Sequence, residues 1–420
     1  MSHGPANKHL SYRTSHKMVL PVDQLKPGMY VAALDRPWEE TPFLFQGFVL
    51  QDQQEIEEIG KYCCSVTIDI QSSVEFSVER HSTGSRSIHR KRVSKPDNAR
   101  RNIARADDTF RHTHALVRNI MDDVRLGKAI DTPAAKEAVA ECVNDVLERP
   151  DAMMLLTRIR QKDEYTSQHS LSVSVLSISL GRKIGLPREK LQEVGLSALL
   201  HDVGKVLTPD EVLNKPGRLN EEEMAVMRRH PSDGRDIILS SDGIVGGALD
   251  VAHAHHEKLN GSGYPRGLNA SQMTHYTKMV AITDTFDAIT SDRVYKNGRT
   301  NMFAFKILTN GRKKFWDNDL VFQFIDSVGI YPPGSIVVLS TGETAVVIES
   351  HPKMKLRPKV MVLNNLENPG AEMHLLDLAK VNQDQQGQRL YIVDAVHPNE
   401  SGIDMRALID LGILGNTDTR

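Results

Sequence analysis

The sequence has few cysteines and no long apolar run. Only three of its 420 residues are cysteine, and Cys63 and Cys64 are adjacent, which argues against a framework of disulfide bonds. No apolar stretch approaches the about 20 residues of a membrane-spanning helix, and the first 18 residues lack the apolar run of a signal peptide. With 52 Lys and Arg against 54 Asp and Glu, the charge balance favours no polyanionic partner. These absences predict a cytoplasmic protein that neither enters a membrane nor binds nucleic acid.

The length of the chain predicts several domains, because 420 residues exceed one ordinary hydrophobic core. Apolar side chains recur at helical spacing through the middle of the chain, as at Leu116, Ile120 and Val124. The break at Tyr331-Pro332-Pro333-Gly334 ends this region. Short strands are expected after it, at Ile336–Leu339, Thr344–Glu349, Lys359–Leu363 and Arg389–Val393.

We therefore predict a multidomain fold with a mainly all-α core between two smaller modules. The N-terminal module is expected to be α+β and the C-terminal module to be rich in β-strand. The segment before the core is polar and basic and has few apolar residues, which is typical of a linker. The predicted layout is an N-terminal module at 1–80, a linker at 81–108, a helical domain at 109–330 and a C-terminal module at 331–420.

Histidine is the one unusual residue in the composition, with 17 copies against two tryptophans. His169 and Asp202 lie on the apolar stripes of predicted helices, where an ionisable side chain is costly unless it is paired or bound to a metal. Gly204 is expected to cap the helix that ends at His201 and Asp202. A lone histidine on such a stripe is usually a hydrogen-bonded core residue. Seven such groups in one helical region instead predict a metal centre: His169, His201, Asp202, His230, His255, His256 and Asp284.

The types of these side chains restrict the metal. All seven offer nitrogen or oxygen, and the nearest cysteine, Cys142, lies alone on an upstream helix. This donor set favours Mn, Fe, Ni or Zn over a structural zinc knuckle or a copper–thiolate site. Seven ligands exceed what one site with room for water requires. Two divalent ions bridged by one carboxylate use the set naturally.

Three sequence blocks resemble the HD-GYP domains of the HD phosphohydrolase superfamily, over about residues 150–330. The first is His201-Asp202-Val203-Gly204-Lys205, and the second is His255-His256-Glu257 with Gly261-Ser262-Gly263-Tyr264-Pro265. The third runs from Ile282 to Ala288 and continues as Ser291-Asp292-Arg293-Val294-Tyr295-Lys296. Residues 22–50 resemble the uncharacterised domain that often precedes HD-GYP domains in bacteria. The resemblance implies an HD-type helical core.

The resemblance also implies an activity, which is the metal-dependent hydrolysis of cyclic di-GMP to linear pGpG, to GMP, or to both. It assigns His169, His201, Asp202 and Asp284 to one metal. It assigns Asp202, His230, His255 and His256 to the second metal, so that Asp202 bridges the two. It gives Asp202 and Lys205 catalytic roles, and it assigns Glu257 to orienting a ligating histidine. The residues it places at the substrate are Gly263, Tyr264, Asp287, Arg293 and Lys296, of which Asp287 matches either a contact to the guanine edge or a contact behind a metal ligand.

Some members of the family bind a third metal with a glutamate one helical turn before the first histidine. The matching residue here is Tyr165, and Glu164 precedes His169 by five positions, which turns it away from the face of His169. We therefore expect two divalent ions and no third one. Fe and Mn are favoured, and Ni and Zn stay open.

Two other functions are compatible with these residues. A receptor would bind cyclic di-GMP or a protein with little turnover, although every expected ligand is present. Another HD phosphohydrolase would act on nucleoside triphosphates or phosphomonoesters, although the Gly-Tyr-Pro block with Arg293 and Lys296 argues against it. Cyclases with a GGDEF domain are candidate signalling partners, and the sequence leaves a homodimer open.

Overall fold

The computed structural model describes residues 17–36, 41, 48–50, 52–69, 97–159, 165–244, 246–292, 298–351, 354–363, 373–384 and 386–410. The chain forms two compact units, Met1–Lys91 and Arg92–Arg420. Each unit is described by itself below. Among the described residues, none of the helices combines the length and the apolar character that crossing a bilayer requires.

The first unit is a small α+β module, as predicted. Its antiparallel sheet has the order β1 (Lys17–Pro21), β4 (Ser65–Asp69), β2 (Tyr30–Leu34) and β3 (Phe48–Val49). Helix α1 (Gln53–Gly60) begins at Asp52, whose carboxylate accepts the backbone N–H of Glu55 at 3.0 Å. Ile56 and Ile59 of α1 share a buried cluster with Val66 and Ile68 of the sheet, so the helix covers one face of it.

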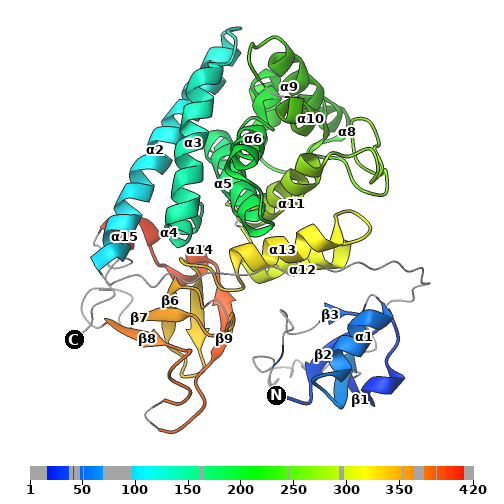
Figure 1. The fold of residues 1–420 in the computed structure, drawn as a ribbon, viewed down its shortest axis with the longest axis vertical. Coiled ribbons are helices and arrows are strands. Elements are labelled where there is room, and N and C mark those ends of the chain that lie inside the picture. Colours follow the sequence, from blue (N-terminus) through cyan, green and yellow to red (C-terminus); the bar gives the residue numbers. More distant parts are fainter. Residues whose placement is uncertain are drawn as a thin grey trace, which may run out of the picture. The chain divides into compact units, whose positions relative to one another are not determined.

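The second unit begins with an all-α region, coloured cyan to yellow in Figure 1, whose helices agree with the predicted fold class. The helices are α2 (Asp97–Arg125), α3 (Thr132–Glu148), α4 (Pro150–Leu156), α5 (Tyr165–Lys183), α6 (Arg188–Leu199), α7 (Asp210–Leu213), α8 (Glu221–Met227), α9 (His230–Leu239), α10 (Gly246–Ala254), α11 (His275–Thr290), α12 (Asn301–Gly311) and α13 (Asn318–Val328).

Helix α5 is the centre of this region. Residues 167–181 are all buried, because α2, α3, α6, α11 and α13 contact the helix from different sides. A helix buried all round needs no polar face, and its small serines let neighbouring backbones approach. Ser174, for example, donates a hydrogen bond to the Gly195 carbonyl of α6 at 2.8 Å. Helix α5 therefore holds its one histidine, His169, deep inside the domain.

Helix α2 begins at Asp97, inside the segment that the composition assigns to a linker. The prediction of a linker up to residue 108 is therefore wrong for residues 97–108, while residues 81–96 lie outside the described residues. Ala106 and Phe110 of α2 belong to the main buried cluster, together with Val139 of α3. Within this stretch of α2, Ala106 is buried while Arg105 and Asp108 are exposed, so a polar composition is compatible with one side of a long helix.

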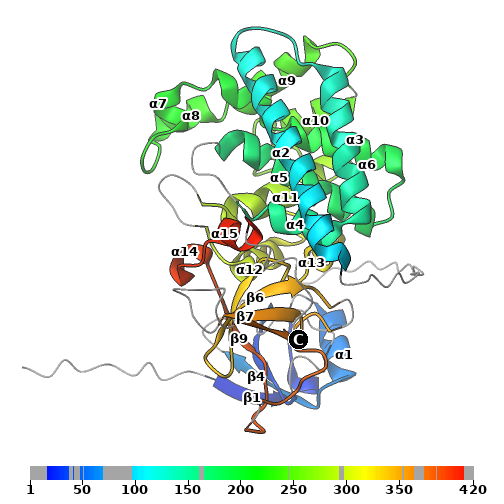
Figure 2. The same cartoon turned by 90° about the vertical axis from the view of Figure 1, so that its left-hand side faces the viewer.

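The C-terminal module is a five-stranded antiparallel sheet with two short helices (Figure 2). Three predicted strands form as expected, the fourth is shifted to β9, and β8 was not predicted. The strand order is β8 (Met373–Asp377), β7 (Lys359–Leu363), β6 (Thr344–Glu349), β5 (Ile336–Leu339) and β9 (Ile392–Val396). Helices α14 (Pro398–Ser401) and α15 (Met405–Asp410) follow.

Candidate metal centre

The seven predicted ligands converge in the interior of the helical region. Six of them are buried, and only His256 is partly open, with 25% of its side chain exposed. Each comes from the end or the inner face of a helix. His169 lies in α5, His201 and Asp202 follow α6, His230 begins α9, His255 and His256 follow α10, and Asp284 lies in α11.

Gly204 explains how two of these helix ends meet. A Cβ atom at Gly204 would lie 2.1 Å from the carbonyl oxygen of His230 and 2.4 Å from the nitrogen of Gly234. The absence of a side chain therefore lets the start of α9 pack directly on the turn that carries His201 and Asp202. The prediction that Gly204 caps a helix is wrong, since α6 ends at Leu199 and Gly204 lies in the 3₁₀ helix Val203–Leu207.

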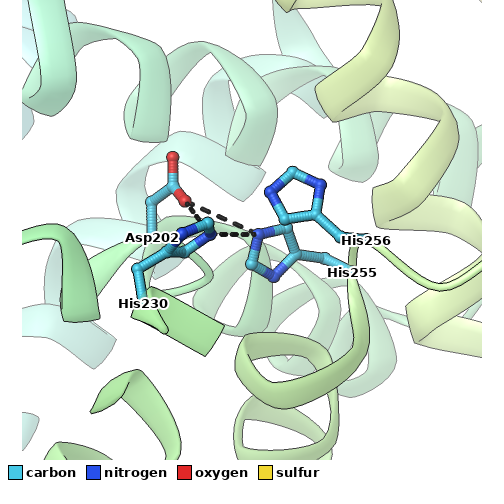
Figure 3. Close-up of side chains that lie close together, drawn as sticks. All are labelled: Asp202, His230, His255 and His256. Carbon is cyan, nitrogen blue, oxygen red and sulfur yellow. Dashed lines mark hydrogen bonds and ion pairs between the residues drawn. The ribbon is translucent and has the colours of Figure 1, made fainter. Parts of the chain in front are cut away.

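Asp202 lies between two groups of histidines. Its Oδ1 atom is 3.4 Å from Nε2 of His230 and 3.5 Å from Nε2 of His255 (Figure 3). Its Oδ2 atom is 3.3 Å from Nε2 of His201 and 3.5 Å from Nε2 of His169. One carboxylate thus presents one oxygen to each pair.

Asp284, which lies in α11, also faces histidines of both groups. Its Oδ1 atom is 3.2 Å from Nε2 of His169, and its Oδ2 atom is 3.9 Å from Nδ1 of His256. Potential ligand atoms within 4.8 Å of one another form two groups, which are Asp202 with His230, His255 and His256, and His169 with His201 and Asp284. Each group is large enough to hold one ion.

The outer ring nitrogens determine which way the imidazoles point. Four histidines place Nδ1 against an oxygen acceptor, which makes Nδ1 the protonated nitrogen of the neutral ring and leaves the Nε2 lone pair facing the carboxylates. The contacts are His169 to Asp287 Oδ2 at 2.7 Å, His201 to the Ala198 carbonyl at 2.7 Å, His230 to the Met227 carbonyl at 2.7 Å, and His255 to the Val251 and Ala252 carbonyls at 3.1 Å.

The charges of the cluster favour the binding of cations. Burial lowers the pKa of His230 to about 3, so this ring is neutral at physiological pH. Burial opposes ionisation of Asp202, but its neighbours His201 and Lys205 bring its pKa well below the usual value. Two buried atoms, His201 Nε2 and Asp202 Oδ1, have no hydrogen-bond partner among the described residues. Histidine lone pairs and negatively charged carboxylate oxygens converge here, and this donor set fits divalent ions.

Lys205 lies at the edge of the cluster. It follows Asp202 in the 3₁₀ helix, and its ammonium group forms a short ion pair with Asp202 Oδ2. Its side chain is 19% exposed, so it is accessible from outside the cluster. Lys205 therefore contacts the buried Asp202 carboxylate and is itself partly open to solvent.

Asp287 lies directly behind one of the seven candidate ligands, His169. It is 2% exposed, and its Oδ2 accepts hydrogen bonds from His169 Nδ1 at 2.7 Å and from the Ser291 hydroxyl at 3.0 Å. Of the two roles predicted for Asp287, these contacts agree with the one behind a metal ligand, since they orient His169. A contact of Asp287 with the guanine edge stays a prediction.

Glu257 also has another role than the predicted one. Its buried carboxylate accepts the backbone N–H groups of Arg266 at 2.7 Å and Leu268 at 2.9 Å, so it holds the loop after the Gly-Tyr-Pro block rather than a histidine ring. Gly263 packs on the same turn, since its Cβ would lie 2.4 Å from the Cα of Glu257. A contact of the Gly263 backbone with substrate stays a prediction.

Tyr264 lies beside His256, the partly exposed member of the seven candidate ligands. Its ring stacks on His256 with centroids 4.7 Å apart, and the guanidinium carbon of Arg228 lies 5.2 Å from the Tyr264 ring centroid. Met224, Arg228 and Tyr264 line an open cleft next to the cluster. Arg228 was not among the predicted site residues, and the signal in the sequence that points to it is its position two residues before His230.

Some predicted residues lie outside this description. Arg293 and Lys296 belong to the segment 293–297, and Glu164 to the segment 160–164, neither of which the structure describes. The structure describes the backbone of Tyr165 as the first residue of α5, but not its side chain. The substrate roles of Arg293 and Lys296 and the absence of a third metal therefore stay predictions.

Family models match three parts of the chain. An HD domain matches residues 153–320, which contain all seven clustered side chains. A domain of unknown function matches residues 17–135, and a KOW domain associated with HD domains matches residues 336–402. The match to the domain of unknown function extends beyond the first unit, which ends at Lys91, through α2 and into the start of α3.

Several curated proteins are similar to this chain. A cyclic di-GMP phosphodiesterase of Pseudomonas aeruginosa is 36% identical over 352 residues, which cover 82% of this chain and 84% of that protein. A 3′3′-cGAMP-specific phosphodiesterase of Vibrio cholerae is 39% identical over 34% of this chain and 33% of its own length. A cyclic di-GMP phosphodiesterase response regulator of Xanthomonas campestris is 38% identical over 40% of this chain and 45% of its own. The similarity to the first protein covers more than four fifths of each chain, and the chain therefore belongs to the HD-domain phosphodiesterases of the HD-GYP type.

Proposed function

We propose that this chain hydrolyses cyclic di-GMP at the cluster around Asp202 and releases pGpG, GMP or both. The position of Asp202 carries the proposal, since its two oxygens face different histidine pairs at 3.3–3.5 Å. The Pseudomonas relative, which is similar over most of its length, is named for this substrate.

The donor set supports two divalent ions, with Fe or Mn preferred. One would be held by His169, His201 and Asp284, the other by His230, His255 and His256, with Asp202 between them. Ions at these positions would lower the pKa of a bound water and neutralise charge on the phosphodiester. The chain orients the ligating histidine rings through the hydrogen bonds of their Nδ1 atoms.

Lys205 and Tyr264 are the described side chains that would contact the substrate. The ammonium group of Lys205 can donate a hydrogen bond to a phosphate oxygen, where it would offset the negative charge that develops as the P–O bond breaks. Tyr264 offers an aromatic ring at the cleft beside His256. Arg293 and Lys296 are proposed as phosphate contacts on the resemblance alone.

The test combines metal analysis with product chromatography on the full chain. Wild-type protein should contain about two metals and convert cyclic di-GMP faster than 3′3′-cGAMP or GTP. Asp202→Ala should lose both metals and all turnover, and His230→Ala should weaken mainly one metal. His275→Ala is the matched control, because His275 is exposed at the start of α11, and it should leave both readouts unchanged.

The possible failures point to different alternatives. Metal-loaded protein that binds cyclic di-GMP without releasing product would be a receptor, which refutes the enzymatic proposal. Preference for 3′3′-cGAMP or for GTP would refute the substrate assignment while keeping the hydrolytic centre. Wild-type protein without metal after reconstitution with Mn or Fe would refute the metal centre itself.

A further inference from the structure

An open cleft of about 730 Å³ lies beside the metal centre. One of the residues that line it, Tyr264, stacks on the candidate ligand His256 with ring centroids 4.7 Å apart. The volume of the cleft falls in the range of about 300–1,000 Å³ that is typical of ligand pockets. The cleft can therefore hold a part of the substrate that extends beyond the metals.

Helix α8 forms one wall of the cleft. A capping box fixes its start, since Asn220 Oδ1 accepts the backbone N–H of Glu223 at 2.8 Å and the Glu223 carboxylate accepts that of Asn220 at 2.9 Å. After its other end, Nδ1 of His230 contacts the Met227 carbonyl at 2.7 Å, which ties the helix to the metal centre. The lining residues that α8 and its C-cap supply recur at helical spacing and share one face: Glu221, Met224, Ala225 and Arg228.

The loop with Tyr264 and Pro265 forms a second wall. The backbone N–H of Tyr264 donates to the His256 carbonyl at 3.4 Å. The buried Glu257 carboxylate accepts the backbone N–H of Arg266 at 2.7 Å, just after the two lining residues. Hydrogen bonds within the chain thus hold both walls, so the shape of the cleft does not depend on a ligand.

The lining combines apolar surface with charges of both signs. Among the described residues that line the cleft, Arg228 supplies a cation, Glu221 a carboxylate and Asn220 an amide. The others are apolar or aromatic: Leu219, Met224, Ala225, Tyr264 and Pro265. This lining suits a phosphate poorly, because a phosphate is costly to bring against apolar surface and is repelled by a carboxylate. It suits a nucleobase, whose faces pack on apolar and aromatic side chains and whose edge carries both acceptors and donors.

Arg228 lies where it can reach the edge of such a base. Its guanidinium carbon is 5.2 Å from the centroid of the Tyr264 ring, a cation–π contact that favours this position of an exposed side chain. A guanidinium donates from a planar fork, and bidentate donation to O6 and N7 of guanine is the commonest specific contact of arginine with a base. Adenine carries an amino group, which is a donor, where guanine has O6. Arginine at this position therefore favours guanine.

We infer that the cleft binds one guanine of the substrate, and that Arg228 selects guanine over adenine by donating to O6 and N7. The inference deepens the proposed function and rests on it, since cyclic di-GMP is the substrate proposed there. Glu221, at the other end of the same helix face, can accept the N1–H and N2–H groups of guanine. Arg228 is not among the candidate metal ligands, so its replacement should leave the ions in place.

The experiment compares guanine with adenine on the full, metal-loaded chain. Binding is measured by calorimetry with phosphorothioate analogues of cyclic di-GMP and cyclic di-AMP, which share sugars and backbone and are hydrolysed slowly. Arg228→Ala should raise Kd about tenfold for the guanine analogue and less than about threefold for the adenine analogue. Metal content should not change, and Arg228→Lys, which keeps a cationic donor, should restore Kd to within about threefold of wild type. Arg229→Ala is the matched control, because Arg229 is 74% exposed and its Nη2 lies 3.8 Å from Asp233 Oδ1, so both affinities should stay unchanged.

Turnover of cyclic di-GMP, measured beside binding, separates the two proposals. Losses of equal size with both analogues would indicate a phosphate contact and overturn the inference. Unchanged affinities in Arg228→Ala, or the same loss in Arg229→Ala, would overturn it too, as would loss of metal that Arg228→Lys does not restore. Wild type that hydrolyses cyclic di-GMP but binds both analogues equally would overturn the inference and keep the proposed function. Wild type that prefers the guanine analogue without turnover would refute the proposed function, and the effect of Arg228→Ala on Kd would still decide the inference.

Discussion

Replacing Asp287 tests whether the residue behind His169 controls the affinity of one metal site. In Asp287→Ala the Nδ1–H of His169 loses the acceptor that now lies 2.7 Å away, in a region where both side chains are at most 3% exposed. A hydrogen bond to a charged partner contributes about 1.5–3 kcal/mol. If the loss falls entirely on the bound ion, affinity at the site of His169, His201 and Asp284 should drop about 10- to 150-fold.

Because the ligands form two separate groups, the loss of metal affinity in Asp287→Ala is expected at one site and not at the other. Asp287 contacts His169, which belongs to one group, whereas His230, His255 and His256 belong to the other. Titration of the chelated protein with Mn²⁺ in a calorimeter should therefore show one weakened and one unchanged site. Metal analysis after dialysis should show a loss approaching one ion per chain. Asp287→Asn keeps a neutral acceptor oxygen, so its affinity should lie between those of wild type and Asp287→Ala.

A neighbouring residue provides the control. The Ser291 hydroxyl also donates to Asp287, at 3.0 Å, but His169 is not among its contacts. Ser291→Ala should therefore change metal affinity by less than about threefold, because a neutral hydrogen bond is weaker than a charge-assisted one. Wild-type affinity at both sites in Asp287→Ala would refute the reasoning, and an equal loss at both sites would show that the substitution disturbs the whole cluster.

Three further substitutions test other parts of the structure. Gly204→Ala places a Cβ 2.1 Å from the His230 carbonyl and should destabilise the fold by about 1–3 kcal/mol or more in urea unfolding. Gly246→Ala meets no atom within 4 Å and is its control, so equal stability of the two would contradict the packing argument. Arg293→Ala should raise KM by about 10- to 150-fold without loss of metal, whereas loss of metal would refute a substrate role. Burial holds the pKa of His230 at about 3 in the fold, against 6.5 for a free ring, so from pH 6.5 down to about 3 only the unfolded state gains this proton. The stability of metal-free protein should thus fall with decreasing pH, and in His230→Gln the slope should be smaller by about 1.4 kcal/mol per pH unit, whereas an unchanged slope would show that His230 titrates normally.

Local signals in the sequence were sufficient for most of the fold. Strands β5, β6 and β7 have the predicted bounds, because their runs of branched apolar residues end at clear turn residues. Strand β8, Met373–Asp377, was missed, since its His374 and Asp377 interrupt the apolar pattern and its pairing with β7 is what makes it a strand. Helix α2 begins earlier than predicted for a similar reason. A helix needs few apolar residues per turn when a neighbouring helix covers them, as α3 does for α2. The amino-acid composition of a segment does not reveal such a neighbour.

The seven candidate ligands followed from the sequence alone, because ionisable residues on apolar stripes are too costly to occur repeatedly without a function. The sequence also carried the motifs that resemble the HD-GYP family. It did not determine which oxygen of Asp202 faces which histidine pair, or that Asp287 lies behind His169. These relations join residues 33 and 118 positions apart, as His169 to Asp202 and His169 to Asp287. Only the packing of α5 against α6 and α11 brings such side chains together, so hydrogen-bond partners across helices were decided by the tertiary structure.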